Sequence, residues 1–259
     1  MDYFEKLDTK PDEDLSWNIP EQKQGSVNII GGSLQNFRTE IKTAEFLSNN
    51  YPLKEVRLIL PDTLKNKLPP LPNFTFVPAT ESGSMDDSQM LRDVFNASDF
   101  NLVLGDLSKN AITSKAITGA SATAEKMTLL TRDTVDLAAE NEIDKLLMNE
   151  NIILLATMPQ LLKIFRAVYY PKMLLLSEPL MQVAEALHKF TLSYPVSIVT
   201  LNEGQILVAS EGIIKAVALE KTGYSALTLW NGELAAKIVA MNIYTPNSFI
   251  KATSSVLFK

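Results

Sequence analysis

The chain has 259 residues, a length that allows one large α/β domain or two small ones. With 46% hydrophobic and 21% charged residues, its composition is that of a soluble globular protein. It has no cysteine, which excludes disulfides and thiolate metal sites and suits a reducing compartment. A net charge of −6 argues against a binder of nucleic-acid phosphates, and a single histidine nearly excludes a serine–histidine triad or a histidine-based metal site.

The first residues, MDYFEKLDTKPDEDL, are charged and lack the apolar core of a secretory signal. No apolar run approaches the ~18–20 residues of a membrane span. We therefore expect a cytoplasmic protein. Residues 1–24 are polar and contain Pro11 and Pro20, and we expect them to form an arm over the domain with room for one short helix.

Residues 25–259 are predicted to form a single domain in which short apolar strands alternate with helices. The predicted strands are 26–30, 56–60, 74–77, 99–106, 127–131, 151–156 and 195–201. The predicted helices are 40–49, 62–68, 86–97, 108–122, 140–150, 158–170 and 177–191. Continuous apolar strands are covered on both faces, so a largely parallel sheet between two helical layers is expected.

The pattern changes after residue 201. Two runs, 204–210 and 212–219, are joined by Glu211-Gly212, which predicts an antiparallel hairpin. Helices near 232–244 and 247–257 follow. The expected fold is a three-layer α/β/α sandwich with a mostly parallel sheet and a C-terminal antiparallel hairpin.

Ligands of open α/β sheets bind beyond the carboxyl ends of the strands. This rule selects the turns Gly31-Gly32-Ser33, Gly105-Asp106, Thr131-Arg132-Asp133, Ala156-Thr157-Met158 and Asn202-Glu203-Gly204. A glycine pair lets the backbone approach a phosphate closely, but a plain strand-to-helix turn has the same sequence. Asp106 and Asp133 could aim carboxylates into the crevice, or cap the helices that follow, the first of which is expected to begin at Ser108. His188 is expected to be solvated or at a helix end.

Asn231-Gly232-Glu233 precedes an apolar-periodic run. A helix start offers free N–H groups and a positive dipole end to phosphate oxygens, and a carboxylate there could take a proton from a substrate hydroxyl. Alternatively, Asn231 caps the helix and Glu233 complements its dipole, which spacing alone favours.

Taken in order, these turns resemble the ribokinase-like superfamily, and most nearly its ATP/ADP-dependent NAD(P)H-hydrate dehydratases, a carbohydrate-kinase-like family. The resemblance spans roughly residues 25–245. NIIGGS matches the opening strand and glycine pair, and DFNLVLGDLSK the strand before a Gly-Pro-Gly-Leu-Gly turn. LLTRDTVDL resembles a strand with an acidic turn, and ILLATMPQLLKI a Thr-Pro-His-Pro-Gly-Glu segment. SIVTLNEGQILVASEG resembles the strand–Lys-Gly–hairpin segment, and NGELAAKIVA resembles Thr-Gly-Asp with its helix.

Several family positions differ in this sequence. Only Pro159 remains of Pro-His-Pro-Gly-Glu, and Leu201 or Asn202 stands at the lysine position. The catalytic aspartate corresponds to Glu233, or to Asn231 if the register slides by two, and asparagine cannot act as a base. A reacting group displaced by about 1 Å can cost on the order of a hundredfold in rate, and Glu233 is one methylene longer than aspartate.

The resemblance implies a divergent enzyme that phosphorylates the hydroxyl of hydrated NADH or NADPH and eliminates it, repairing the cofactor. It implies ATP or ADP with Mg²⁺ as cofactors and no metal ligand in the chain. It implies a catalytic Glu233. The nucleotide-binding residues would be Asn202, Gly204, Asn231 and Gly232, and the substrate-binding residues Gly31, Gly32, Ser33, Asp106 and Asp133.

The partners that the resemblance implies are an adenine nucleotide and a small molecule similar to NAD(P)H-hydrate. Neither nucleic acid nor a membrane is expected as a partner. Homo-oligomerisation is one alternative, because the apolar residues of the last helices suit a subunit interface. Burial of these residues within the domain is the simpler explanation. Two alternative functions remain: a non-catalytic nucleotide-binding or assembly homologue, and a small-molecule, carbohydrate-like kinase.

Overall fold

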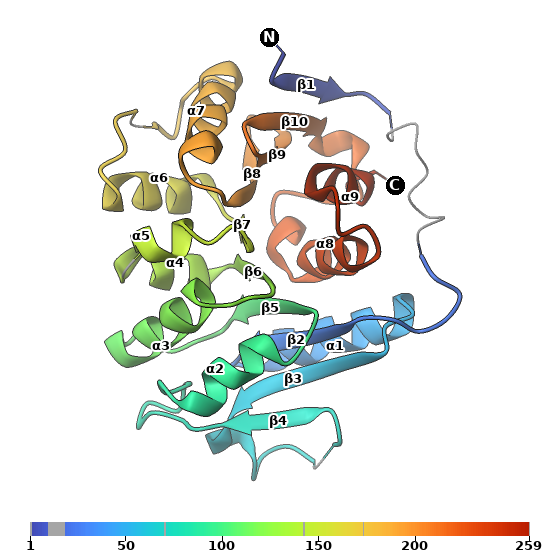
Figure 1. Ribbon diagram of the computed structural model, residues 1–259, viewed down its shortest axis with the longest axis vertical. Helices are drawn as coiled ribbons and strands as arrows, with labels where there is room; N and C mark the ends of the chain where they lie inside the picture. Colours follow the sequence, from blue (N-terminus) through green and yellow to red (C-terminus); the bar gives the residue numbers. More distant parts are fainter. Residues whose placement is uncertain (1, 10–18, 70, 142, 173, 259) are drawn as a thin grey trace.

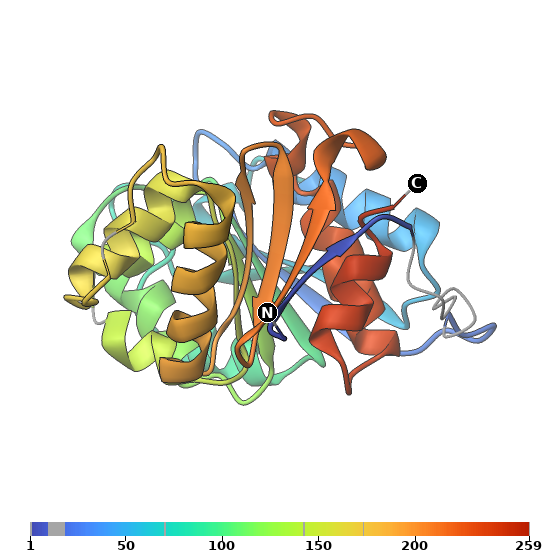
Figure 2. The same ribbon diagram turned by 90° about the horizontal axis from the view of Figure 1, so that it is seen from above.

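A ten-stranded sheet runs through the middle of the described structure, and helices cover both of its faces (Figures 1 and 2). The computed structural model of the chain describes residues 2–9, 19–69, 71–141, 143–172 and 174–258. Within this part of the chain, the strand order is β1-β10-β9-β8-β7-β6-β5-β2-β3-β4. Neighbouring strands are parallel except at β8–β9 and β9–β10.

The strands are short and mostly buried, as continuous apolar runs predict. They are β1 (Phe4–Leu7), β2 (Ser26–Gly31), β3 (Glu55–Pro61), β4 (Phe74–Val77), β5 (Phe100–Gly105), β6 (Met127–Thr131), β7 (Ile152–Leu155), β8 (Ser197–Asn202), β9 (Gln205–Ser210) and β10 (Ile213–Ala218). The mostly parallel sheet and the antiparallel β9–β10 hairpin confirm the predicted fold class.

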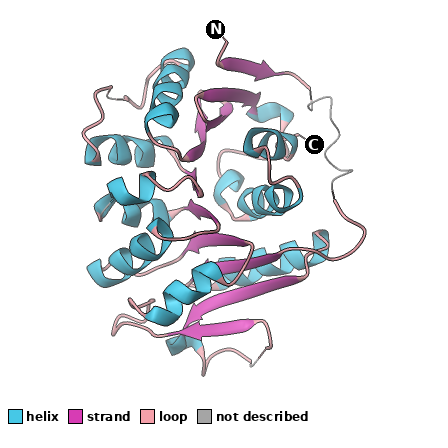
Figure 3. Ribbon diagram, viewed as in Figure 1, coloured by secondary structure: helices cyan, strands magenta, loops and turns pink. Residues whose placement is uncertain are grey.

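The helices fall into two layers (Figure 3). One layer contains α2 (Gln89–Asn96), α3 (Ala111–Ala122), α4 (Asp133–Glu140), α5 (Ile143–Leu147), α6 (Met158–Ala167) and α7 (Leu180–Ser193). The other contains α1 (Arg38–Asn50), α8 (Glu233–Tyr244) and α9 (Phe249–Ser255).

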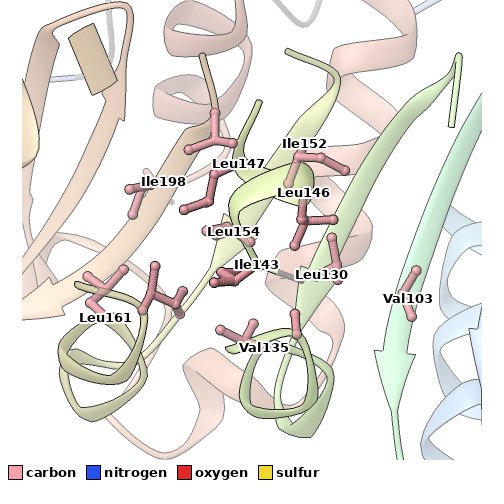
Figure 4. Close-up of a cluster of buried hydrophobic side chains, with 14 of the residues drawn as sticks. Val103, Leu130, Val135, Ile143, Leu146, Leu147, Ile152, Leu154, Leu161 and Ile198 are labelled. Atoms are coloured by element: carbon pink, nitrogen blue, oxygen red, sulfur yellow. The ribbon is translucent and has the colours of Figure 1, made fainter. Parts of the chain in front are cut away.

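Each layer buries its own apolar core against the sheet. Figure 4 shows part of the first core, where side chains of α4, α5 and α6 pack on β5, β6, β7 and β8. Burial of apolar surface stabilises the folded state by about 25 cal/mol per Å². The two packed cores hold the sheet in place, so the turns at its strand ends are attached to a rigid element. No helix among the described residues is long and apolar enough to cross a membrane.

Two helical segments differ from their predicted extents. Residues 62–68 contain only a short 3₁₀ turn, Asp62–Leu64, because Leu64 is buried while the residues from 65 to 67 are exposed and offer no second apolar position. The predicted helix 140–150 is observed as the shorter α5, Ile143–Leu147, and a separate helix, α4, precedes it at Asp133–Glu140.

The segment predicted as an arm contributes a strand to the sheet. β1 pairs in parallel with β10 and forms one edge, and the ring of Tyr3 stacks on His188 of α7 at 4.0 Å between centroids. His188 Nδ1 also lies within hydrogen-bond distance of the Gly212 carbonyl. His188 is therefore half-buried in mid-helix and not solvated as expected. No helix lies at residues 2–9 or 19–24 of the predicted arm, and residues 10–18 lie outside the described residues.

Candidate functional site

Four of the five glycines selected from the sequence, Gly31, Gly32, Gly105 and Gly232, lie together at the carboxyl ends of β2 and β5. β2 ends at Gly31, and the N–H of Gly32 donates to the carbonyl of Gly105 at the end of β5 (2.8 Å). A side-chain carbon at Gly31 would lie 2.6 Å from that carbonyl oxygen, so glycine is required there. Gly232, just before α8, packs against Leu104 of β5 and Thr43 of α1. The starts of α1 and α8 therefore meet at the ends of β2 and β5.

Ser33 closes the turn that follows β2. Its N–H donates to the carbonyl of Asn36 at 2.6 Å, and its hydroxyl accepts from the N–H of Asn36 at 3.4 Å. The side chain is buried. Ser33 thus shapes the glycine turn, and its role in binding substrate stays a prediction.

Asp133 holds the turn after β5. Its two carboxylate oxygens accept from the N–H groups of Asp106 and Leu107, each at 3.0 Å. A side-chain carbon at Gly105 would lie 2.1 Å from Asp133 Oδ1, so the carboxylate occupies the space that this glycine leaves. Burial raises the pKa of Asp133, while the two N–H groups oppose that rise. Asp133 is the first residue of α4, whose N-cap position is Arg132, so its carboxylate serves the neighbouring turn.

Asp106 does not cap α3. That helix begins at Ala111 and not at Ser108, because the side chain of Asn110 accepts the N–H of Thr113 at 2.8 Å. Asp106 instead accepts from the hydroxyl of Thr39 at 2.9 Å and pairs with the Arg132 guanidinium at 2.6 Å.

Asp106 and Arg132 both adopt left-handed backbone conformations, with φ of 55° and 57°. Such conformations cost of order 1–3 kcal/mol for residues other than glycine and persist where the surroundings hold them. The Gln160 side chain, which also completes a capping box with Thr157 at the start of α6, donates to the Arg132 carbonyl at 2.6 Å. The turns that contain Asp106 and Arg132 are therefore both strained, and the ion pair between these two side chains joins them.

At the start of α8, Gly232 has a φ of 97°, and a side-chain carbon there would lie 2.5 Å from Thr43 Oγ1. The Asn231 side chain accepts the N–H of Glu233 at 3.0 Å. The Glu233 carboxylate is 40% exposed and pairs with Lys237 Nζ at 2.9 Å. The N-cap position is Gly232, so Asn231 contacts the helix start from the residue before the cap and does not occupy the cap position itself. The catalytic assignment of Glu233 stays a prediction.

A cavity of about 490 Å³ opens between the starts of α1 and α8. Three cationic side chains, Arg38, Lys42 and Arg132, line it together with one carboxylate, Glu233. Its wall also carries aromatic and apolar side chains and an amide: Phe46, Trp230, Leu227 and Asn231. A second cavity of about 500 Å³ shares Arg38, Thr39 and Arg132 with the first and adds Asp106. The sequence reasoning selected the turn that contains Arg132, but it did not select Arg38, Lys42, Phe46 or Trp230.

Beneath these cavities lies Glu40, the third residue of α1. Its side chain is fully buried, and its Oε1 would lie 2.7 Å from a side-chain carbon at Gly31. Neither carboxyl oxygen has a hydrogen-bond partner among the described residues. Burial, and secondarily the charge of Asp106, raise its pKa from 4.5 to about 8. A pKa of about 8 keeps the Glu40 carboxyl mostly protonated at neutral pH.

Asn202 and Gly204 lie at the end of β8 and in the turn before β9, and they line neither of these two cavities. The Asn202 amide donates to the carbonyl of Glu178 at 3.4 Å, and Gly204 supplies the φ of 73° that the turn requires. Their assignment to a nucleotide site stays a prediction.

No protein-family model matches the sequence, and no curated protein matches it. Solved structures do. A ribokinase-like superfamily protein from Enterococcus faecalis is 14% identical over 99% of this chain and 86% of its own, with a TM-score of 0.65. This chain therefore has the ribokinase-like α/β fold, as its turns predict.

Among the structures that share the fold is the ADP/ATP-dependent NAD(P)H-hydrate dehydratase from Bacillus subtilis, co-crystallised with ATP and Mg²⁺. It is 13% identical over 94% of this chain and 83% of its own, with a TM-score of 0.59. The pyridoxal kinase of the same organism, in complex with ADP, is 9% identical over 90% and 89%, with a TM-score of 0.52. Identities this low establish the fold alone.

Proposed function

We propose that the cavity between α1 and α8 binds a phosphate-bearing small molecule of the nucleotide class, and that the protein is a divergent NAD(P)H-hydrate dehydratase. One observation carries the proposal: Arg38, Lys42 and Arg132 share a cavity with the rings of Phe46 and Trp230. Guanidinium and ammonium groups are strong donors to phosphate oxygens, and aromatic side chains stack on bases. The fold and the resemblance of the turns to that family agree with this ligand class.

In the proposed reaction, a phosphoryl group passes from ATP or ADP to the hydroxyl of a hydrated nicotinamide, and phosphate is then expelled. Transfer of this kind depends on positioning, charge neutralisation and a base. Arg38 and Lys42 would neutralise phosphate oxygens, and the backbone before α8 would lie beside them. Arg132, whose charge is partly compensated by Asp106 at 2.6 Å, would add to this attraction. Glu233 would act as base only after releasing Lys237, 2.9 Å away.

The side chains fit an anion better than a resident metal ion. Among the described residues, no group of three or more His, Asp or Glu side chains is arranged to hold a metal ion. Asp106 is engaged by Arg132, and Asp133 by two backbone N–H groups. Mg²⁺ would thus bind mainly through the phosphates of the nucleotide, where it would neutralise their charge.

Thermal unfolding with ATP, ADP, AMP, NADH and NADPH tests the ligand class. A ligand at a hundred times its dissociation constant stabilises the fold by about 2.7 kcal/mol, so at least one nucleotide should raise the unfolding temperature. Lys42→Gln should abolish most of that rise. Lys115→Gln is the matched control, because Lys115 is exposed on α3 in the opposite helical layer. No rise with any nucleotide refutes the proposal.

Catalysis is tested by supplying hydrated NADH with ATP or ADP and following the return of NADH absorbance. Phosphate transfer to an alcohol panel, without that return, would support the carbohydrate-like kinase instead. Binding without either reaction would support the non-catalytic homologue, with which the pairing of Glu233 to Lys237 agrees. Unchanged turnover in Glu233→Gln would exclude that residue as the base.

A further inference from the structure

Glu40 is a buried ionisable group next to the two cavities, and the proposed chemistry does not use it. It lies on the buried face of α1 with Thr43, Ala44 and Leu47. The absent side chain of Gly31 leaves the space that its carboxyl fills. A buried polar group without a partner costs of order 1–3 kcal/mol, so the fold keeps Glu40 there at a cost.

Nothing among the described residues neutralises Glu40 except a proton. The nearest guanidinium, that of Arg132, is engaged by Asp106 at 2.6 Å. Neither carboxyl oxygen of Glu40 receives a hydrogen bond from another described residue, and the backbone N–H of Glu40 itself offsets the rise of the pKa only in part. No metal-holding group of side chains includes Glu40 in the described structure. Removing the proton would place an unpaired charge in a buried site, which is strongly unfavourable.

The charge of the site depends on that proton. The charged groups that act on Glu40 are those of Asp106, Arg132 and Asp133. The side chains that line the two cavities carry three positive charges, on Arg38, Lys42 and Arg132, and two negative charges, on Asp106 and Glu233. This lining has one net positive charge, which the charge of an ionised Glu40 next to it would offset.

We propose that Glu40 sets the affinity of the cavity for phosphate-bearing ligands: neutral, it leaves the cations in excess, and its ionisation weakens binding of the anion. This rests on the proposed function for the identity of the ligand. Because Glu40 is buried, water and salt screen its charge little, and its effect on Arg132 and Asp106 is larger than that of a surface carboxylate. The raised pKa of Glu40 brings the transition into the pH range just above neutrality.

The test is calorimetric titration with ADP from about pH 7 to 9.5. A phosphate whose last pKa is about 6 keeps its charge over that range, and a lysine with a pKa of about 10.4 stays largely protonated. The wild-type affinity should fall about tenfold between pH 7 and 9, since one pH unit beyond a pKa corresponds to at most a tenfold change. Glu40→Gln, which imitates the neutral acid, should bind with an affinity that is flat over the same range.

Glu45→Gln is the matched control, because Glu45 is exposed on the same helix. It should follow the wild-type profile. A second measurement needs no variant: at pH 8.5, in buffers of different ionisation enthalpy, ADP binding to the wild type should take up part of a proton. A wild-type affinity that is flat with pH, or a Glu40→Gln profile identical to the wild type, overturns the inference while ADP binding itself upholds the proposed ligand class.

Titration with sulfate further distinguishes failure of the Glu40 proposal from failure of the proposed ligand class, because the charge of sulfate is constant from about pH 7 to 9.5. Binding of sulfate without ADP refutes the nucleotide class, and the same pH profile measured with sulfate then decides the role of Glu40. Binding of neither anion overturns both proposals.

Discussion

At the scale of the residue, Glu40 also makes the stability of the fold depend on pH. Its pKa in the folded state is about 8, above the 4.5 of an ordinary glutamate, so the folded protein retains a proton that the unfolded chain has lost between these values. The contribution of Glu40 is therefore fully present below about pH 4.5 and is lost as pH rises to about 8. The slope is at most about 1.4 kcal/mol per pH unit.

We expect Glu40→Gln to remove this slope. Urea unfolding between pH 5 and 9 should show the wild type losing stability relative to the variant as pH rises, with the variant the more stable of the two at pH 9. Glu45→Gln should keep the wild-type slope. Parallel curves for wild type and Glu40→Gln would show that Glu40 titrates alike in the folded and unfolded chains.

The individual residues of the site were predictable to different degrees. Gly31, Gly32 and Gly105 follow apolar strands, and turn chemistry alone selects them. Glu40 was not selected, although it lies at the i, i+3, i+4, i+7 spacing with Thr43, Ala44 and Leu47, which is the spacing of a buried helical face. A glutamate on such a face was the available signal. Only the fold shows that Asp106 faces Arg132, because a side-chain ion pair between two turns leaves no trace in sequence spacing.

At the scale of the element, the start of α8 is fixed by Gly232. A side chain at this position is unfavourable for two reasons: φ is 97°, and the added carbon would lie 2.5 Å from Thr43 Oγ1. Gly232→Ala should therefore destabilise the protein by about 1–3 kcal/mol in urea unfolding. Gly119→Ala, in mid-α3 with no atom within 4 Å of an added carbon, should be neutral or stabilising.

The two causes can be separated by adding Thr43→Ala. This change removes the clashing oxygen but leaves the backbone strain, so the double variant should recover part of the stability lost in Gly232→Ala. Strict additivity of the two single changes would mean that α1 and α8 are not coupled at this point.

Elements with strong local signals were predicted, and elements that depend on distant partners were not. The strands β2 to β10 follow from apolar runs in the sequence. β1 is four residues long, carries charges at Glu5 and Lys6, and pairs with β10, more than two hundred positions away in the chain. Its sequence contains no information about that partner, which is why residues 4–7 were assigned to an arm. Residues 62–68 lack a second buried apolar position, so their helical spacing was not supported by packing.

At the scale of the whole molecule, the charge of the cavity opposes that of the protein. The chain carries a net charge of −6, whereas three cationic side chains gather at the first cavity. A negative protein repels phosphates in general, so local cations must supply the attraction for a phosphate-bearing ligand. Arg38 and Lys42 are exposed at this cavity, and exposed charges are screened within about 8 Å at physiological ionic strength.

Binding of ADP should accordingly weaken as salt is added. We expect an affinity several-fold lower at 500 mM than at 50 mM sodium chloride, because the Debye length shortens from about 14 Å to about 4 Å over that range. Lys42→Gln should flatten this dependence, and Lys115→Gln should leave it unchanged, although both remove one positive charge from the molecule. If the two variants responded alike, net charge and not the cavity would govern the attraction. A wild-type affinity indifferent to salt would instead mean that ring stacking on Phe46 and Trp230 dominates, and the cations would lose their assigned role.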